Sequence, residues 1–155
     1  MSAQIEYYPM PAFTRLVVSD LAAATRWYGE ALGFQRVFTM PGPGGRPLLV
    51  HLRWAKYADL LLVAEDPRTS QPAGPRGAGV TLYFQAGARP VDEIAETAKN
   101  MGANVVEGPV NRPWNAREVL IRDPDGYLLA FTEGPVDPGV GMERIMASLQ
   151  RGEEQ

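Results

Sequence analysis

The sequence predicts an α+β fold in which one order of strands and helix occurs twice. Glycine and proline together make up 30 of the 155 residues, and they fall in bunches that separate short apolar segments. Each half of the chain has one amphipathic helical pattern, and these patterns end at Gly33 and Gly102, 69 positions apart (102 minus 33). The same offset relates Leu61 to Ala130, but few residues are identical. The repeat is therefore one of pattern more than of sequence.

The first predicted module spans residues 11–66 and has the order βαβββ. Residues 13–20 (FTRLVVSD) are rich in branched and aromatic side chains, which indicates a strand. Asp20 then precedes apolar residues at helical spacing, so it is predicted to cap a helix that ends at Gly33. Three further strands are predicted over residues 35–40, 48–54 and 58–64.

The last two of these strands are close enough in sequence to form a hairpin. A two-residue turn at Ala55–Lys56 would pair Trp54 with Tyr57 and Val50 with Leu61. His51 would then lie on the opposite face of the sheet from Leu61. In that position we expect it to be hydrogen-bonded under a helix or at the sheet surface.

The second predicted module spans residues 77–135. A helix is expected over residues 90–102, and strands over 79–85, 104–107, 117–123 and 127–132. The DPDG sequence at residues 123–126 is a strong turn signal between the last two strands. The tail, residues 136–155, contains apolar residues at helical spacing and is expected to pack on the domain or on a second subunit. All 155 residues are expected to form a single domain.

Composition excludes several kinds of chemistry. The chain has no cysteine, so it has no disulfide framework, thiolate zinc site, iron–sulfur cluster or cysteine nucleophile. It has one histidine, so no site in one chain can use two imidazoles. The formal net charge is -3 without a basic stripe, which argues against a nucleic acid partner. The short apolar runs and the N-terminal residues predict neither a membrane span nor a secretory signal, so a cytoplasmic protein is expected.

Three features in this order resemble the vicinal oxygen chelate superfamily, which includes glyoxalase I, extradiol dioxygenases, and fosfomycin- and bleomycin-resistance proteins. They are VSDL before a helix that contains a WY pair and ALGF, the repeated βαβββ pattern, and the final DPDGYLLAFTE. The resemblance covers about residues 11–133. It implies a U-shaped mixed sheet built from both modules, with a cavity inside and helices outside. It leaves open whether modules pair within one chain or between chains.

Catalytic members of this superfamily hold a divalent metal with His and Glu side chains on the first and last strand of each module. Counted from the landmarks above, the corresponding positions are occupied by Phe13, Leu61, Gly79 and Ala130. None of these side chains can bind a divalent metal. A count shifted by one residue gives Thr14, Leu62, Val80 and Phe131, again without His, Glu or Asp. The sequence therefore predicts no metal and no other cofactor.

Alternation along the strands predicts an apolar and aromatic cavity that also holds two guanidinium groups. It places Val50 and Leu52 inward with Phe13, and Val119 and Ile121 inward with Ala130. The candidate ligand-binding residues are Arg15, Val50, Trp54, Tyr83, Trp114 and Arg117. Such a cavity is suited to a planar or aromatic ligand with an anionic or carbonyl group.

Three of the polar or aromatic candidates have alternative roles. Trp114 either stacks over the ligand or packs its own loop onto the domain or a second subunit. Arg117 either contacts the ligand or pairs with a nearby acid. Arg15 needs a partner if it points inward, and a ligand anion, Glu133 or another acid would serve. Glu133 is otherwise expected to be an exposed charge at the strand end, and it is also a candidate partner for His51.

The first functional hypothesis is a metal-free binding protein of the bleomycin-resistance type, a homodimer that sequesters a small aromatic or amphipathic molecule. The second is a lyase, isomerase or dioxygenase of the same superfamily with non-standard site residues. Such an enzyme would use either a metal or an acid or base such as His51, Tyr83 or Glu133. The third is a regulatory or assembly module without a ligand. The absence of the metal-binding side chains favours the first.

Overall fold

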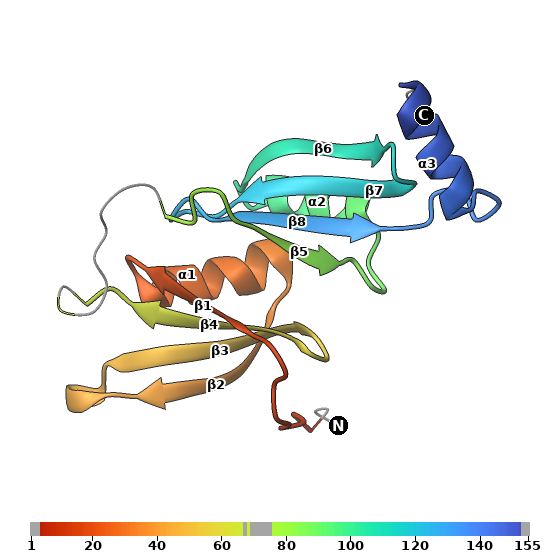
Figure 1. Ribbon diagram of the computed structural model, residues 1–155. Helices are drawn as coiled ribbons and strands as arrows, with labels where there is room; N and C mark the ends of the chain where they lie inside the picture. The colour runs from red at the N-terminus through yellow and green to blue at the C-terminus, as the bar shows by residue number, and fades with distance from the viewer. Residues whose placement is uncertain (1–3, 67, 69–75, 153–155) are drawn as a thin grey trace. The chain divides into compact units, whose positions relative to one another are not determined.

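The computed structural model describes residues 4–66, 68 and 76–152, and the chain divides into two compact units, Met1–Gly74 and Pro75–Gln155 (Figure 1). Each unit contains a mixed four-stranded sheet and a helix packed on it. This confirms the prediction of two βαβββ modules. A single U-shaped sheet built from both modules stays a prediction.

The first unit has the sheet order β1-β4-β3-β2, with β1 parallel to β4 and the other neighbours antiparallel. Its elements are β1 (Thr14–Val18), α1 (Leu21–Trp27), the π-helical turn η1 (Tyr28–Leu32), β2 (Gln35–Pro41), the short 3-10 helix η2 (Pro43–Gly45), β3 (Pro47–Ala55) and β4 (Ala58–Ala64).

The two ends of the first helical segment are set by the residues that the sequence indicates. The Asp20 carboxylate accepts a hydrogen bond from the Ala23 amide at 2.9 Å, which caps α1. Gly33 has a left-handed φ of 90°, and this conformation ends η1. Between them, α1 packs on β3 and β4 with Leu21 and Ala24 buried. Each fully buried side chain of leucine size contributes about 2 kcal/mol to folding.

The second unit has the order β5-β8-β7-β6, again with one parallel pair, β5 and β8. Its elements are β5 (Thr81–Gln85), α2 (Val91–Asn100), β6 (Asn104–Arg112), β7 (Ala116–Arg122), β8 (Leu128–Glu133) and α3 (Met142–Arg151). The DPDG turn is confirmed, because the Gly126 amide donates to the Asp123 carbonyl at 3.0 Å. The predicted end of β6 at Glu107 is wrong. The strand continues through Gly108 and Pro109 with a shifted register, which an edge strand tolerates.

Helix α3 packs on the unit through few residues. Ile145 and Ser148 are buried, whereas Met142, Met146 and Leu149 are between 43% and 67% exposed. Asn115 holds the segment that leads to this helix. Its side chain donates to the Asp137 carbonyl and accepts from the Asp137 amide, both at 2.8 Å.

No helix in the described part of the chain is both long and apolar enough to cross a membrane.

The predicted register of the β3–β4 hairpin is wrong by one residue. The turn lies at Lys56–Tyr57, where Tyr57 adopts a φ of 66°, and Ala55 pairs with Ala58. A shift in register between Arg53 and Ala55 then makes His51 the partner of Leu61. Because side chains alternate along a strand, a shift of one residue moves every side chain to the other face.

This correction separates the two faces of the first sheet. Val50 and Leu52 pair with Leu62 and Leu60, and all four are buried on the face that carries α1, which we call the helix face. His51 therefore lies with Leu61 on the opposite face, which we call the open face.

In the second sheet, the prediction that Val119 and Ile121 share a face with Ala130 is also wrong. Val119 pairs with Phe131 and Ile121 with Leu129, and these four residues are fully buried on the side that contacts α2. Ala130 pairs with Leu120 instead. Val119 and Ile121 thus belong to the core between sheet and helix and do not share a face with Ala130.

Candidate functional site

The open face of the first sheet carries a row of four side chains, one from each strand. Arg15 of β1 lies beside Leu61 of β4, Leu61 lies beside His51 of β3, and His51 lies beside Phe38 of β2. Neighbouring strands are about 4.8 Å apart, so the backbones at Arg15 and His51 are separated by about 10 Å. We call these four residues the Arg15 row. It combines a cation, an imidazole and an aromatic ring on one surface.

Arg15 is the unpaired charge of this row. Its side chain is exposed and makes no hydrogen bond or ion pair with any residue that the structure describes. The acid partner considered for it, Glu133, is engaged elsewhere, because its carboxylate accepts a hydrogen bond from the Val91 amide at 3.0 Å. Glu133 thus holds the first N–H of α2 and is not a free charge at the strand end.

His51 is held by a buried carboxylate. Its Nε2 atom lies 2.8 Å from Oδ1 of Asp59, whose side chain is fully buried. Arg53 donates to the same oxygen at 2.8 Å, and the Tyr8 hydroxyl donates to Oδ2 at 3.0 Å. A carboxylate only accepts hydrogen bonds, so Nε2 carries the hydrogen and Nδ1 of the neutral ring keeps its lone pair.

These contacts also set the charge state of Asp59. Burial by itself would raise the pKa of its carboxyl. The hydrogen bonds from His51, Arg53 and Tyr8 outweigh that effect and lower the pKa below its ordinary value. Asp59 is therefore a buried anion at neutral pH and is compensated by its basic neighbours.

The same network fastens the N-terminal segment to the β3–β4 hairpin. The Arg53 guanidinium lies over the Tyr8 ring, 4.3 Å from its centroid, and donates to the Glu6 carbonyl at 2.8 Å. The Tyr57 amide donates to the Tyr8 hydroxyl at 2.8 Å. This network is not among the sequence predictions. Its one signal is Asp59 itself, an acid inside the apolar strand ADLLLVA that needs buried partners.

In the second unit, Tyr83 occupies the place that corresponds to Arg15. It pairs with Ala130 as Arg15 pairs with Leu61, and 59% of its surface is exposed. The same sheet carries a second buried carboxylate, Glu118, which is 3% exposed. Unlike Asp59, it lies next to an exposed aromatic ring, Trp114.

Glu118 holds Trp114 in place. Its carboxylate accepts hydrogen bonds from the Trp114 indole N–H at 3.1 Å, from the Thr132 hydroxyl at 3.3 Å and from Arg112 at 3.0 Å. The Trp114 side chain is nevertheless 48% exposed. It borders a cleft of about 310 Å³ that is also lined by Thr132, Glu133 and, from α3, Met142 and Ile145.

Three other predicted ligand residues have partners within their own unit. Val50 is buried against α1, and Trp54 packs on Phe34 with ring centroids 5.3 Å apart. Arg117 donates to both oxygens of Asp92 at 2.6 and 2.7 Å, so it pairs with an acid of α2. This pairing lowers the pKa of Asp92. A role in ligand binding stays a prediction for all six candidates.

The residues at the superfamily's metal positions do not fit a metal. Phe13 is 52% exposed just before β1, and Gly79 precedes β5. Leu61 and Ala130 lie within their sheets, and none of the four side chains has a metal-binding atom. Across residues 4–66, 68 and 76–152, no group of three or more His, Asp or Glu side chains could hold a metal ion.

The two βαβββ modules define the class of protein, because they form a glyoxalase-type α+β fold. Residues 11–131 match the model of the Glyoxalase/Bleomycin resistance protein/Dioxygenase superfamily. The chain belongs to this superfamily, as the sequence motifs predict.

Individual relatives agree with this assignment. The chain is 27% identical over 126 residues to Virulence protein STM3117 of Salmonella typhimurium strain LT2, covering 76% of this chain and 79% of that protein. It resembles the crystal structure of a glyoxalase/bleomycin resistance protein from Streptomyces sp. CB03234 with a TM-score of 0.59 and 26% identity, covering 78% and 97% of the two chains. TioX from Micromonospora sp. ML1 shares the fold, with a TM-score of 0.61, 23% identity and coverage of 78% and 95%.

Proposed function

We propose that this protein binds a small aromatic or amphipathic molecule with an anionic or carbonyl group and holds it without a metal. Membership of the superfamily supports a ligand-binding role. The side chains at the superfamily's metal positions support a mode of binding that uses no metal. In this proposal the protein sequesters its ligand, in the manner of the bleomycin-resistance members.

Arg15 carries the proposal. It is an exposed guanidinium on the open face with no partner in the described part of the chain, and a guanidinium binds carboxylates and related anions through two parallel hydrogen bonds. Phe38 in the same row is 43% exposed, and Phe13 near the start of β1 is 52% exposed. A cation beside accessible aromatic rings is suited to an aromatic anion.

The second unit has accessible aromatic side chains of its own. Tyr83 is exposed at the position that corresponds to Arg15, and Glu118 fixes Trp114 beside its cleft. The exposed apolar residues of α3, among them Met142 and Met146, support a homodimer, because packing against a second copy would remove them from water.

Ligand binding can be tested by calorimetric titration with 2-naphthoate, an aromatic carboxylate. We expect Arg15→Gln to weaken naphthoate binding about tenfold, since a hydrogen-bonded charge pair is lost. Arg46→Gln is the control, because it removes the same charge from an exposed position in the loop between β2 and β3. Equal affinities of wild type and Arg15→Gln would reject the Arg15 anchor.

The absence of a metal is tested separately by thermal unfolding. The melting temperature is measured with and without Ni²⁺, Zn²⁺, Mn²⁺ and Fe²⁺, because a metal that binds the folded state raises it. We expect no change. A rise that a chelator reverses would contradict metal-free binding.

One observation favours a second function, an enzyme that uses His51 as a base. A histidine oriented by a carboxylate is the usual arrangement for accepting a proton, and His51 shares the open face with Arg15. In this alternative Nδ1 takes a proton from a ligand held at Arg15.

The two functions are separated by incubating the protein in D₂O with aromatic carboxylic acids that have an acidic C–H. Mass spectrometry then measures the exchange of that hydrogen for deuterium. Exchange that is lost in His51→Gln supports catalysis, and no exchange supports binding alone.

A further inference from the structure

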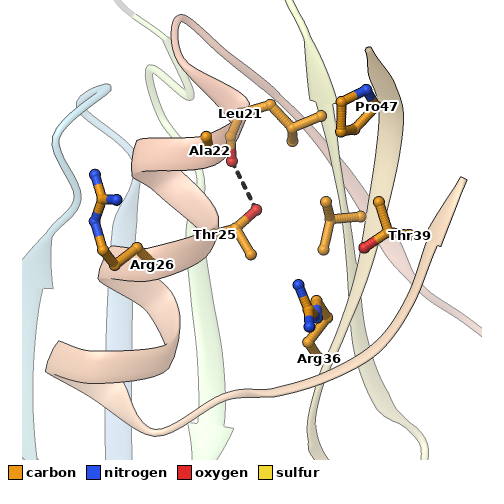
Figure 2. A pocket seen from close by; sticks show the side chains of 8 residues that line it. Leu21, Ala22, Thr25, Arg26, Arg36, Thr39 and Pro47 are labelled. Atoms are coloured by element: carbon orange, nitrogen blue, oxygen red, sulfur yellow. Dashed lines mark hydrogen bonds between the residues drawn. The ribbon is translucent and has the colours of Figure 1, made fainter. Parts of the chain in front are cut away.

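We propose that the first unit has a second, separate ligand site on its helix face, for a small amphipathic carboxylate. A cleft of about 310 Å³ lies between α1 and the strands β2 and β3 (Figure 2). This volume is at the lower end of the range for small-molecule sites, about 300–1,000 Å³. The inference is independent of the function proposed for the open face.

A bulge in β2 creates the polar end of this cleft. Arg36 and Thr39 are three residues apart, so in a regular strand they would point to opposite faces. The register shifts between Arg36 and Phe38, and as a result Arg36 pairs with Leu52 and Thr39 with Val50. Both partners lie on the helix face, so the bulge places the guanidinium and the hydroxyl on the same side of the sheet. Bulges often redirect side chains beside functional sites.

The remaining walls of the cleft are mostly apolar. Leu21 and Ala22 come from α1, and Pro47 and Val50 come from β3. The Thr25 hydroxyl donates to the Leu21 carbonyl at 2.6 Å, so its hydrogen is used within the helix. Figure 2 shows the Leu21 and Thr25 side chains facing those of Pro47 and Thr39 across the cleft, with the Arg36 side chain pointing into it. The apolar walls suit a hydrocarbon or aryl body.

The charge of the residues that line the cleft indicates which polar group the ligand carries. Arg36 and Arg26 both border the cleft, and no acidic residue does. Among residues 4–66, 68 and 76–152, neither arginine makes an ion pair or hydrogen bond, and the Thr39 hydroxyl makes no hydrogen bond. Arg36 and Thr39 can therefore both donate to one anionic group. An apolar body with a single carboxylate fits both parts of the cleft.

This site and the Arg15 row lie on opposite faces of one sheet. Val50 lines the cleft, whereas the next residue in β3, His51, belongs to the open face. A substitution at Arg36 therefore changes the cleft without touching Arg15, and a substitution at Arg15 leaves the cleft intact. Experiments on Arg36 and Arg15 can therefore reject the helix-face site and the open-face site independently of each other.

The test is an NMR titration of the ¹⁵N-labelled full chain with sodium decanoate below its micelle concentration. We expect amide shifts in residues 21–26, 36–39 and 48–50. Arg36→Gln should weaken decanoate binding about tenfold. Ala22→Phe should abolish decanoate binding, because Ala22 is an exposed residue of the cleft lining and a phenyl ring there fills the cleft. This variant leaves Arg36 unchanged. Arg46→Gln and Arg15→Gln are matched charge controls and should leave decanoate affinity unchanged.

Three results would overturn the site. The first is the absence of amide shifts at millimolar decanoate. The second is an affinity that is equal in wild type, Arg36→Gln and Ala22→Phe, provided that the spectra show both variants to be folded. The third is a larger loss in Arg15→Gln than in Arg36→Gln, which would place decanoate on the open face.

Discussion

The Nε2 atom of His51 lies 2.8 Å from the Oδ1 atom of Asp59, whose carboxylate is fully buried. Asp59 pairs directly with Arg53 across the hairpin, and His51 reaches it from the next position on the same face. Together with the Tyr8 hydroxyl, these donors occupy both oxygens of the carboxylate. The buried anion is thus a junction between β3, β4 and the N-terminal segment.

Asp59→Ala should destabilise the protein by about 3–5 kcal/mol, because it leaves His51 and Arg53 largely buried without their acid. Urea denaturation measures this change. Glu6→Gln is the control in the same segment, since its ion pair with Lys56 is exposed and should contribute less than about 1 kcal/mol. Equal effects of the two substitutions would contradict the role of Asp59 as a buried junction.

The lowered pKa of Asp59 makes this contribution dependent on pH. A carboxyl whose pKa is lower in the folded state stabilises the protein above its unfolded pKa, about 3.9 for aspartate. The stabilisation is lost as the pH falls from about 4 through the folded pKa. The difference in unfolding free energy between wild type and Asp59→Asn should therefore shrink as the pH is lowered from 7 to 3. A difference that stays constant over this range would contradict the prediction.

Local signals predicted the elements of the fold well. Asp20 and Gly33 mark the ends of one helical segment because capping and a left-handed glycine are properties of a few adjacent residues. The DPDG turn is local for the same reason. The hairpin has no such signal, because Tyr57, not glycine, adopts the positive φ in its turn. The predicted register of the hairpin was therefore wrong by one residue, and the predicted faces of Val50 and His51 were reversed.

The candidate site was harder to predict because its contacts join residues far apart in sequence. Arg15 lies in β1, as the strand pattern predicts, but its side chain is exposed, so the cost of burying a charge does not apply to it and its role in ligand binding stays a prediction. The Asp59 network depends on a chain segment about 50 residues away, which contributes Tyr8. Likewise, no periodicity indicates that Arg117 finds its acid in α2. Only the three-dimensional arrangement reveals such pairs.

Glu118 should be the main stabilising acid of the second unit. Glu118→Ala removes the acceptor of Arg112, Trp114 and Thr132 from a buried position, and we expect a loss of about 3–5 kcal/mol. Trp114→Phe removes one of these bonds and should cost about 1 kcal/mol. Glu107→Ala removes an exposed acid that also pairs with Arg112 and should cost less than about 1 kcal/mol. The order of these losses in urea denaturation checks the network, and a reversed order would refute it.

Arg117 provides a last prediction, which separates structural from ligand-binding arginines. Its guanidinium already donates to both oxygens of Asp92 and to Asn111, so an anionic ligand would have to displace these partners. Arg117→Gln should therefore leave naphthoate affinity within about twofold of wild type, whereas Arg15→Gln weakens it about tenfold. Because Asp92 is 58% exposed, the pair should contribute less than about 1 kcal/mol to stability. A tenfold loss of affinity in Arg117→Gln would restore Arg117 as a ligand residue.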